Sequence, residues 1–322
     1  IIDITFPYTK DFKKELQIPK DALYKGKPRS RIAYLCASKR MDWEPVAWTE
    51  FDGKNIVFTD IQKGPVMRVA TYERGRLRFW TDPFEINVSN EFHFFTPSDS
   101  VQDVTLFAKY TLRADEMFLN RMIGGTFEGS NDPDFREKEV LYLINEKPKR
   151  LQTVVQSYSS KSYRYVRYIG PKDSHCNIAE AAFYTPNDTA SLKGKVIGTP
   201  GCFQKDGSHE YTNVFDGDVT TSFDYIEPSG GWSGLDLGTP KQIGRIVYTP
   251  RSYDNYIRSG DDYELFYCAR RNNWKSLGDQ RSKADSLIYI KIPVNALLLL
   301  CNNTRGIQER IFVYTAAEQI WK

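Results

Sequence analysis

Two acidic residues that flank a glycine have the clearest potential for metal chemistry. Asp216-Gly217-Asp218 is followed by Thr220 and Thr221, so several hard oxygen atoms come from one short stretch. Ca²⁺ prefers carboxylate, hydroxyl and carbonyl oxygens of this kind. The same residues also suit a structural turn, in which aspartate side chains accept hydrogen bonds from backbone amides. The sequence leaves both interpretations open.

A second group of residues has the chemistry to recognise a sugar. The segment RSYDNYIR places five suitable side chains on one loop: Arg251, Tyr253, Asn255, Tyr256 and Arg258. A tyrosine ring can stack on the apolar face of a galactose-type sugar, while guanidinium and amide groups bond its hydroxyls. Tyr225 is expected on the neighbouring loop, beside Asp224 and Glu227.

That loop also has a purely structural interpretation. Arg251 and Arg258 can pair with Asp254 and Asp261 and so make a long loop rigid. The sequence does not decide between a binding loop and a rigid one.

No arrangement of catalytic residues stands out. Catalysis by side chains needs a nucleophile beside a base, paired carboxylates with tuned pKa values, or an open metal site. His93, His175 and His209 lie in different segments, and the chain has no HExxH, GxSxG or glycine-rich phosphate loop. We therefore expect a protein that is not an enzyme.

Length and composition favour several β-rich domains. The chain has 322 residues, of which 14% are aromatic, with 20 Tyr and 19 Phe. This length predicts two or three domains, and the aromatic content favours strands. A net charge of +3 gives no strong attraction for nucleic acid. No apolar run approaches the roughly 20 residues of a membrane-spanning helix.

The cysteines indicate no metal site. Five of them are scattered along the chain without a CxxC pair: Cys36, Cys176, Cys202, Cys268 and Cys301. Zinc is therefore not expected. We interpret them as buried free thiols on strands, because an unpaired cysteine behaves as a small apolar residue.

After residue 190, four sequence motifs follow one another. The first lies between Asn213 and Gly238 and combines DGDxxTxF with WxxLDLG, and the second is KQIGRIVYTP at 241–250. The third is a hairpin pattern at 262–277, made of DYELFY and WKSL, and the fourth is ERIFVY at 309–314. In this order they resemble the discoidin domain, also called the coagulation-factor type C domain, with its galactose-binding-like jelly roll. The resemblance covers about residues 190–322.

The resemblance implies particular site residues. Its calcium set corresponds to Asp216, Asp218, Thr221 and Glu309, with Glu309 arriving from the last strand and backbone carbonyls completing about six to eight oxygens. Such an ion would pin a loop rather than perform chemistry. Sugar-binding members bind ligands on loops, which matches the segment 251–258 as a loop and not residue by residue.

The first two-thirds of the chain also read as β-structure. Short apolar runs in residues 1–104 are separated by DG, KG and RG turn signals, a pattern typical of sandwiches. The stretch AYLCASKRMDWEPVAW resembles the β-sandwich module between a transglutaminase-like domain and discoidin domains in exported Bacteroidetes proteins. Helical turns are expected only at Lys10 to Leu16 and Ala114 to Leu119.

Residues 105–189 resemble the second half of a discoidin domain and repeat the last third of the chain. Glu180 to Phe183 aligns with Glu309 to Phe312, which suggests a duplicated sandwich. Because this segment has no DGDxxT block, we expect a degenerate copy without the metal site.

The sequence thus predicts an all-β protein of tandem β-sandwiches: a module over 1–104, a degenerate discoidin-like sandwich over 105–189 and a discoidin-like jelly roll over 190–322. The expected function is non-catalytic binding of a glycan or glycoprotein. Alternatives are a structural spacer and a protein–protein adhesion module. The chain begins at Ile1 without a signal peptide, and we expect part of a longer exported protein, periplasmic or on the outer cell surface, with a possible upstream catalytic domain.

Overall fold

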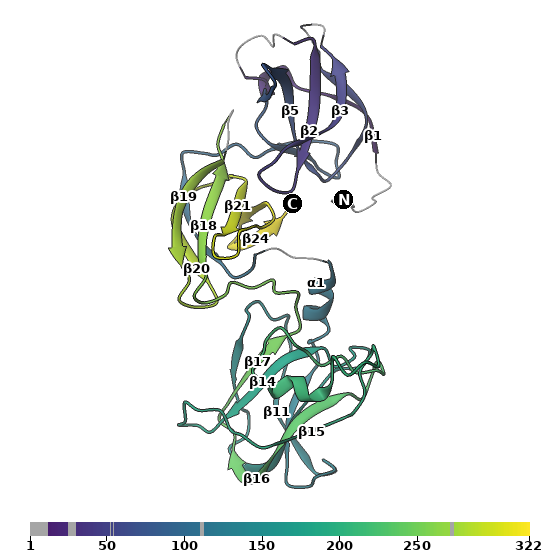
Figure 1. Ribbon diagram of the computed structural model, residues 1–322, viewed down its shortest axis with the longest axis vertical. Coiled ribbons are helices and arrows are strands. Elements are labelled where there is room, and N and C mark those ends of the chain that lie inside the picture. The colour runs from purple at the N-terminus through teal and green to yellow at the C-terminus, as the bar shows by residue number, and fades with distance from the viewer. Residues whose placement is uncertain (1–11, 25–29, 52, 54, 110–112, 271–273) are drawn as a thin grey trace. The chain divides into compact units, whose positions relative to one another are not determined.

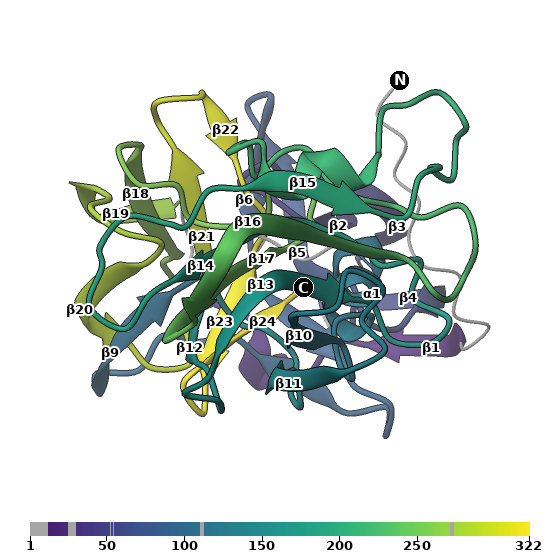
Figure 2. The ribbon, with the colours of Figure 1, turned by 90° about the horizontal axis from the view of Figure 1, so that it is seen from below.

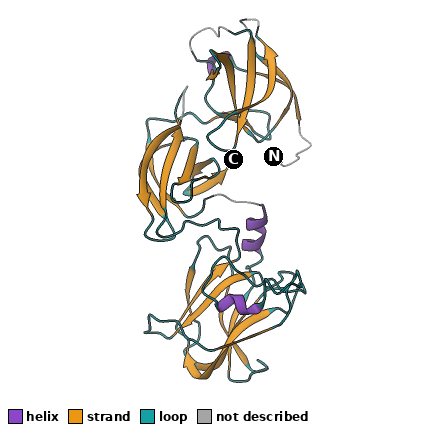
Figure 3. Cartoon of the chain, viewed as in Figure 1, coloured by secondary structure: helices purple, strands orange, loops and turns teal. Residues whose placement is uncertain are grey.

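The chain is built almost entirely of β-strands (Figure 3), which confirms the predicted all-β class. The computed structural model describes residues 12–24, 30–51, 53, 55–109, 113–270 and 274–322. Within them, helix is limited to α1 (Arg113–Asn120) and the 3-10 turns η1 (Lys20–Ala22) and η2 (Tyr211–Phe215). None of these described helices has the length and apolar character to cross a bilayer.

The strands form two compact units. Unit 1 joins Ile1–Tyr110 to Ile257–Lys322, and unit 2 consists of Thr111–Tyr256. Unit 2 is therefore an insertion in the chain of unit 1.

Unit 2 is a β-sandwich (Figure 1). Its larger sheet has the order β11-β10-β13-β16-β15, with bounds Lys138–Leu143, Thr126–Ser130, Ser162–Ile169, Trp232–Gln242 and Lys195–Gly198. Its smaller sheet has the order β12-β17-β14, with bounds Thr153–Gln156, Arg245–Pro250 and Ile178–Tyr184. All neighbouring strands are antiparallel.

The two sheets of unit 2 share an aromatic core. The buried ring of Phe127 on β10 lies 5.1 Å from the ring of Tyr168, 6.0 Å from that of Phe183 and 5.4 Å from that of Tyr248. These partners come from β13, β14 and β17, so one side chain connects both sheets. Packed aromatic side chains contribute strongly to core stability.

The N-terminal part of unit 1 is a second sandwich. One sheet has the order β3-β2-β5-β7-β8 with β6 on β5, and its bounds are Glu44–Glu50, Ile32–Ser38, Val66–Glu73, Phe84–Ile86, Phe92–Phe94 and Arg76–Phe79. The facing pair is β1 (Phe12–Gln17) with β4 (Val57–Gln62). Their core includes Leu16, Leu35, Phe58 and Phe84.

The rest of unit 1 combines one strand before unit 2 with all the strands after it. The larger sheet has the order β19-β18-β21-β23-β24 with β22 on β21, and its bounds are Trp274–Arg281, Asp262–Cys268, Leu298–Asn302, Phe312–Thr315, Glu318–Trp321 and Ile307–Gln308. β9 (Val101–Leu106) pairs with β20 (Leu287–Pro293). Figure 2 shows this larger sheet and the β9–β20 pair from below.

A buried arginine joins the two parts of unit 1. The Arg68 guanidinium lies 4.1 Å from the Phe79 ring centre, and its Nε donates to the carbonyl oxygen of Thr81 over 3.1 Å. Its Nη1 lies 3.7 Å from Cys268 Sγ of the C-terminal part. Trp274 Nε1 also donates to the Met41 carbonyl oxygen over 3.0 Å, which is a second contact between the two parts.

The structure divides the chain differently from the predicted ranges 1–104, 105–189 and 190–322. Position 104 falls within β9, and the boundary at 189/190 separates strands that pair, since β13 pairs with β16 and β14 with β17. The predicted C-terminal domain is itself shared between the units. The motif order suggested one continuous domain, whereas backbone pairing joins the first half of these motifs to the segment before them.

The five cysteines are all free and buried. Three lie on strands as predicted, whereas Cys176 and Cys202 lie outside the named strands. Burial raises the pKa of the Cys36 and Cys176 thiols to about 12 and that of the Cys268 and Cys301 thiols to about 11. Because the thiolate is the reactive form, these thiols are poor nucleophiles at neutral pH.

The division into units predicts how a core mutation spreads. Phe127→Ala should lower the free energy of unfolding of unit 2 by about 3–5 kcal/mol, because it leaves a cavity between the two sheets. In hydrogen exchange, the amides of β14 and β17 should lose protection together, and those of β18 should keep theirs. Loss of protection in β17 together with β18, but not β14, would instead support a domain that begins at residue 190.

Candidate functional site

The acidic turn follows η2 in unit 2. Asp216 Oδ1 accepts a hydrogen bond from the Asp218 amide over 2.7 Å, and its Oδ2 accepts one from Thr221 Oγ1 over 2.8 Å. Asp218 Oδ1 in turn accepts bonds from the amide and hydroxyl of Thr220. Gly217 has a φ of 85°, a conformation that glycine adopts without strain. Asp216, Asp218 and Thr221 are therefore together, in the geometry of a capped turn.

The carboxylate beside this turn belongs to Glu180 on β14. Glu180 Oε1 accepts a hydrogen bond from the Gly217 amide over 2.8 Å. Burial, together with the hydrogen bond and charge of Asp216, raises the pKa of Glu180 to about 8. When two carboxyl groups lie close together in a partly buried site, it is unfavourable for both of them to be ionised. This is an arrangement that a bound cation would stabilise.

Glu309, expected as the fourth ligand, is not part of this arrangement. It belongs to unit 1, where its amide donates to the Leu300 carbonyl oxygen over 2.9 Å. Strand pairing gives the turn Glu180, the residue that aligned with Glu309 in the sequence. In the part of the chain that the structure describes, no three His, Cys, Asp or Glu side chains gather as a metal site, so any cation here would also need backbone or hydroxyl oxygens.

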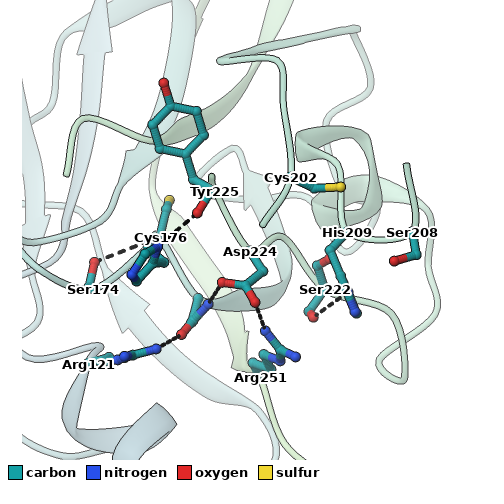
Figure 4. Close-up of polar contacts among 12 residues, drawn as sticks. Arg121, Ser174, Cys176, Cys202, Ser208, His209, Ser222, Asp224, Tyr225 and Arg251 are labelled. Carbon is teal, nitrogen blue, oxygen red and sulfur yellow. Dashed lines mark hydrogen bonds and ion pairs between the residues drawn. The ribbon is translucent and has the colours of Figure 1, made fainter. Parts of the chain in front are cut away.

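A line of polar side chains joins four segments of unit 2 (Figure 4). Arg121 Nη1 donates to Asn177 Oδ1 over 2.8 Å, and Asn177 Nδ2 donates to Asp224 Oδ1 over 2.7 Å. Arg251 Nη1 forms an ion pair with the other oxygen of Asp224. Arg121 follows α1, Asn177 precedes β14 and Arg251 follows β17. The Asp224 carboxylate therefore fixes its own loop to three elements.

The Phe118 ring packs against this polar line. The Arg251 guanidinium lies 4.5 Å from the ring centre of Phe118 on α1. The same ring lies 5.6 Å from that of Tyr253, whose side chain is 53% exposed. Tyr253 thus presents an exposed aromatic ring that contacts the same phenylalanine as the fixed Arg251 guanidinium.

The other residues predicted for sugar binding are placed differently. Asn255 and Tyr256 are only 4% exposed, so they are part of the packed interior and present little surface to a ligand. Tyr225 is half-buried against the core of unit 2. Arg258 belongs to unit 1, where its amide donates to Tyr263 Oη over 3.0 Å. The loop 251–258 crosses from one unit to the other, which residue types alone did not indicate.

The ion pairs of Arg251 and Asp261 differ from those that the rigid-loop interpretation predicted. Arg251 is fixed, but by Asp224 of a different loop. Asp261 accepts a bond from Arg305 Nε over 2.7 Å, and its pKa is lowered although burial opposes that shift, because Asn302 and Arg305 donate hydrogen bonds to it.

A serine and a histidine approach each other nearby, but we assign no catalysis to them. Ser222 Oγ and His209 Nδ1 are 3.4 Å apart, and that nitrogen also lies 3.3 Å from the Ser222 carbonyl oxygen. Ser222 is buried. A nucleophile needs access to its substrate and a base oriented by a third group, which this pair does not display.

Comparison with known proteins returned no relationship: no family model, no curated protein and no solved structure matches the chain. The function must therefore be argued from the geometry of the units themselves.

The Asp224–Arg251 pair should be a structural requirement for the site. Arg251→Ala leaves the partly buried Asp224 carboxylate without its cation and should destabilise unit 2 by about 3 kcal/mol, measured by thermal or denaturant unfolding. Adding Asp224→Asn should recover part of that loss. Arg136→Ala is the matched control, because Arg136 is exposed and pairs with an aspartate on the surface. Equal effects of the two arginine changes would contradict this assignment.

Proposed function

We propose that the chain is a non-catalytic binding protein and that unit 2 binds a glycan. The observation that carries the proposal is the exposed Tyr253 ring, which contacts the Phe118 ring on which the Arg251 guanidinium also packs. An exposed aromatic ring suits a sugar, because the apolar face of the sugar can stack on it.

The rigidity of this surface supports the same proposal. Each polar group is held by another protein group, so little side-chain entropy is lost when a ligand binds. The loops extend from a sandwich, and binding loops on a rigid scaffold are a common arrangement. We extend the proposal to an exported protein, periplasmic or on the outer cell surface.

A protein–protein adhesion module is the second candidate, because unit 1 exposes apolar side chains on one sheet face. Trp48 on β3 lies opposite Tyr34 on β2, and the Tyr34 and Tyr72 rings meet edge to face at 5.2 Å. Trp48 and Tyr72 are 65% and 45% exposed. Leu35, the residue after Tyr34 on β2, has its side chain in the core. Because successive side chains of a strand point to opposite faces, Tyr34 and its neighbouring rings point outward. Contiguous exposed apolar surface often marks an interaction site. The remaining alternative, a structural spacer, predicts no ligand.

For the acidic turn we propose a structural Ca²⁺ held by Glu180 and Asp216, with Asp218, Thr221 and backbone oxygens nearby. The raised pKa of Glu180 supports this, since a carboxyl group that resists ionisation beside another carboxylate is relieved by a cation. The ion would attach the turn to β14 and would perform no reaction. A capped turn without a cation is the competing interpretation.

Glu180→Gln tests the acidic turn. Without divalent cations, the raised pKa of Glu180 means that its contribution to stability is present below its ordinary value of 4.5 and is lost as pH rises through about 8. The variant should therefore gain melting temperature relative to wild type as pH rises across that range. Ca²⁺ should raise the melting temperature of wild type at about pH 8.5 and leave Glu180→Gln unchanged.

Glu309→Gln is the control for the calcium test, because Glu309 is the glutamate of the other unit. It should keep the full response to Ca²⁺. A response that disappears in Glu309→Gln but persists in Glu180→Gln would contradict the assignment, and a wild type that ignores Ca²⁺ would favour the capped turn.

A glycan array, followed by titration calorimetry, tests the binding proposal. Tyr253→Ala should weaken glycan binding at least about tenfold with little change in melting temperature, because the ring is mostly exposed. Tyr158→Ala is the control, since that tyrosine is also exposed in unit 2. Retained binding in Tyr253→Ala would reject this surface. Binding of a protein that is lost in Trp48→Ser alone would favour the adhesion candidate.

A further inference from the structure

The polar line of unit 2 contains more positive than negative charge. Its charged side chains are the guanidiniums of Arg121 and Arg251 and the single carboxylate of Asp224. Arg251 forms an ion pair with the Asp224 carboxylate, and both side chains are largely buried. Asn177, the contact of Arg121, is a neutral amide.

Arg121 is therefore oriented without being neutralised. Among the residues that the structure describes, its side chain donates to Asn177 Oδ1 only. A guanidinium has five N–H donors in a planar fork, which matches the two oxygens of a carboxylate. With one Nη1 hydrogen used by Asn177, most of the fork is left for another acceptor.

The position of Arg121 places this fork beside the proposed sugar surface. Arg121 lies three residues after Phe118, and its amide donates to the Met117 carbonyl oxygen, so the helical geometry continues through it. Residues three apart in a helix share one face. Phe118 supports Tyr253, so Arg121 and the exposed ring lie on the same side of α1.

We propose that the glycan bound by unit 2 is acidic, and that Arg121 binds a carboxylate carried by the sugar. This inference rests on the proposed glycan-binding function and specifies its ligand class. The sugar ring would stack on Tyr253, and its carboxylate would meet the free edge of the Arg121 guanidinium. Asn177 is a positioning residue, since it holds Arg121 and is itself held by Asp224.

Matched pairs of acidic and neutral sugars test the inference. The probes are a galacturonate trimer against a galactose trimer, and sialyllactose against lactose, each titrated into the full chain. Wild type should bind at least one acidic member about tenfold more tightly than its neutral partner, as a charge-assisted bond predicts. The pair that responds identifies whether a uronic or a sialic acid is preferred.

Variants of Arg121 separate this inference from the proposed function. Arg121→Gln should remove the preference for the acidic sugar while the neutral partner binds as in wild type, and Arg121→Lys should restore only part of it, because lysine lacks the fork. Arg136→Gln should change nothing. Equal binding of acidic and neutral sugars by wild type, or a preference that persists in Arg121→Gln, would overturn the inference alone. Absence of binding to every glycan would overturn the proposed function as well.

Discussion

The antiparallel pairing of β13 with β16 and of β14 with β17 is the constraint on which unit 2 depends. It connects two stretches that the motif order assigns to different domains. Because β16 and β17 follow the acidic turn and β14 carries Glu180, this pairing brings the Glu180 carboxylate to the Gly217 amide. It also places Asn177, Asp224 and Arg251 near one another, since each lies at the end of a paired strand or in a loop beside it.

Much of the fold follows from local signals. Short apolar runs with turn residues between them predicted strands, and Ala114 to Leu119 lies within α1 as expected. The described part of Lys10 to Leu16 is the strand β1, because pairing with β4 outweighs its weak helical pattern. The predicted domain boundaries differ from those of the structure. They depend on which strands pair across long sequence separations, and residues 110 and 257, where the chain leaves and re-enters unit 1, have no local signal.

The site was predictable in its parts but not in its assembly. The DGD turn and the loop 251–258 were found from residue types, and the alignment of Glu180 with Glu309 marked both glutamates. Deciding which one reaches the turn requires the strand order. Arg121 gave no signal in the sequence, because an arginine after a short helix becomes notable only when its side-chain partner among the described residues is known to be a neutral amide. Asn255 and Tyr256 showed the opposite error, since residues with binding chemistry also fill interiors.

Because unit 2 interrupts unit 1, unit 1 cannot be completed during synthesis until the whole of unit 2 has been made. All of Thr111–Tyr256 leaves the ribosome before residues 257–322, so unit 2 can form its own sheets first. At that stage β9 still lacks β20, the strand with which it pairs. Until then, Arg68 of the N-terminal sandwich lacks its contact with Cys268. Assembly of unit 1 therefore depends on residues 257–322, the segment that is synthesised last.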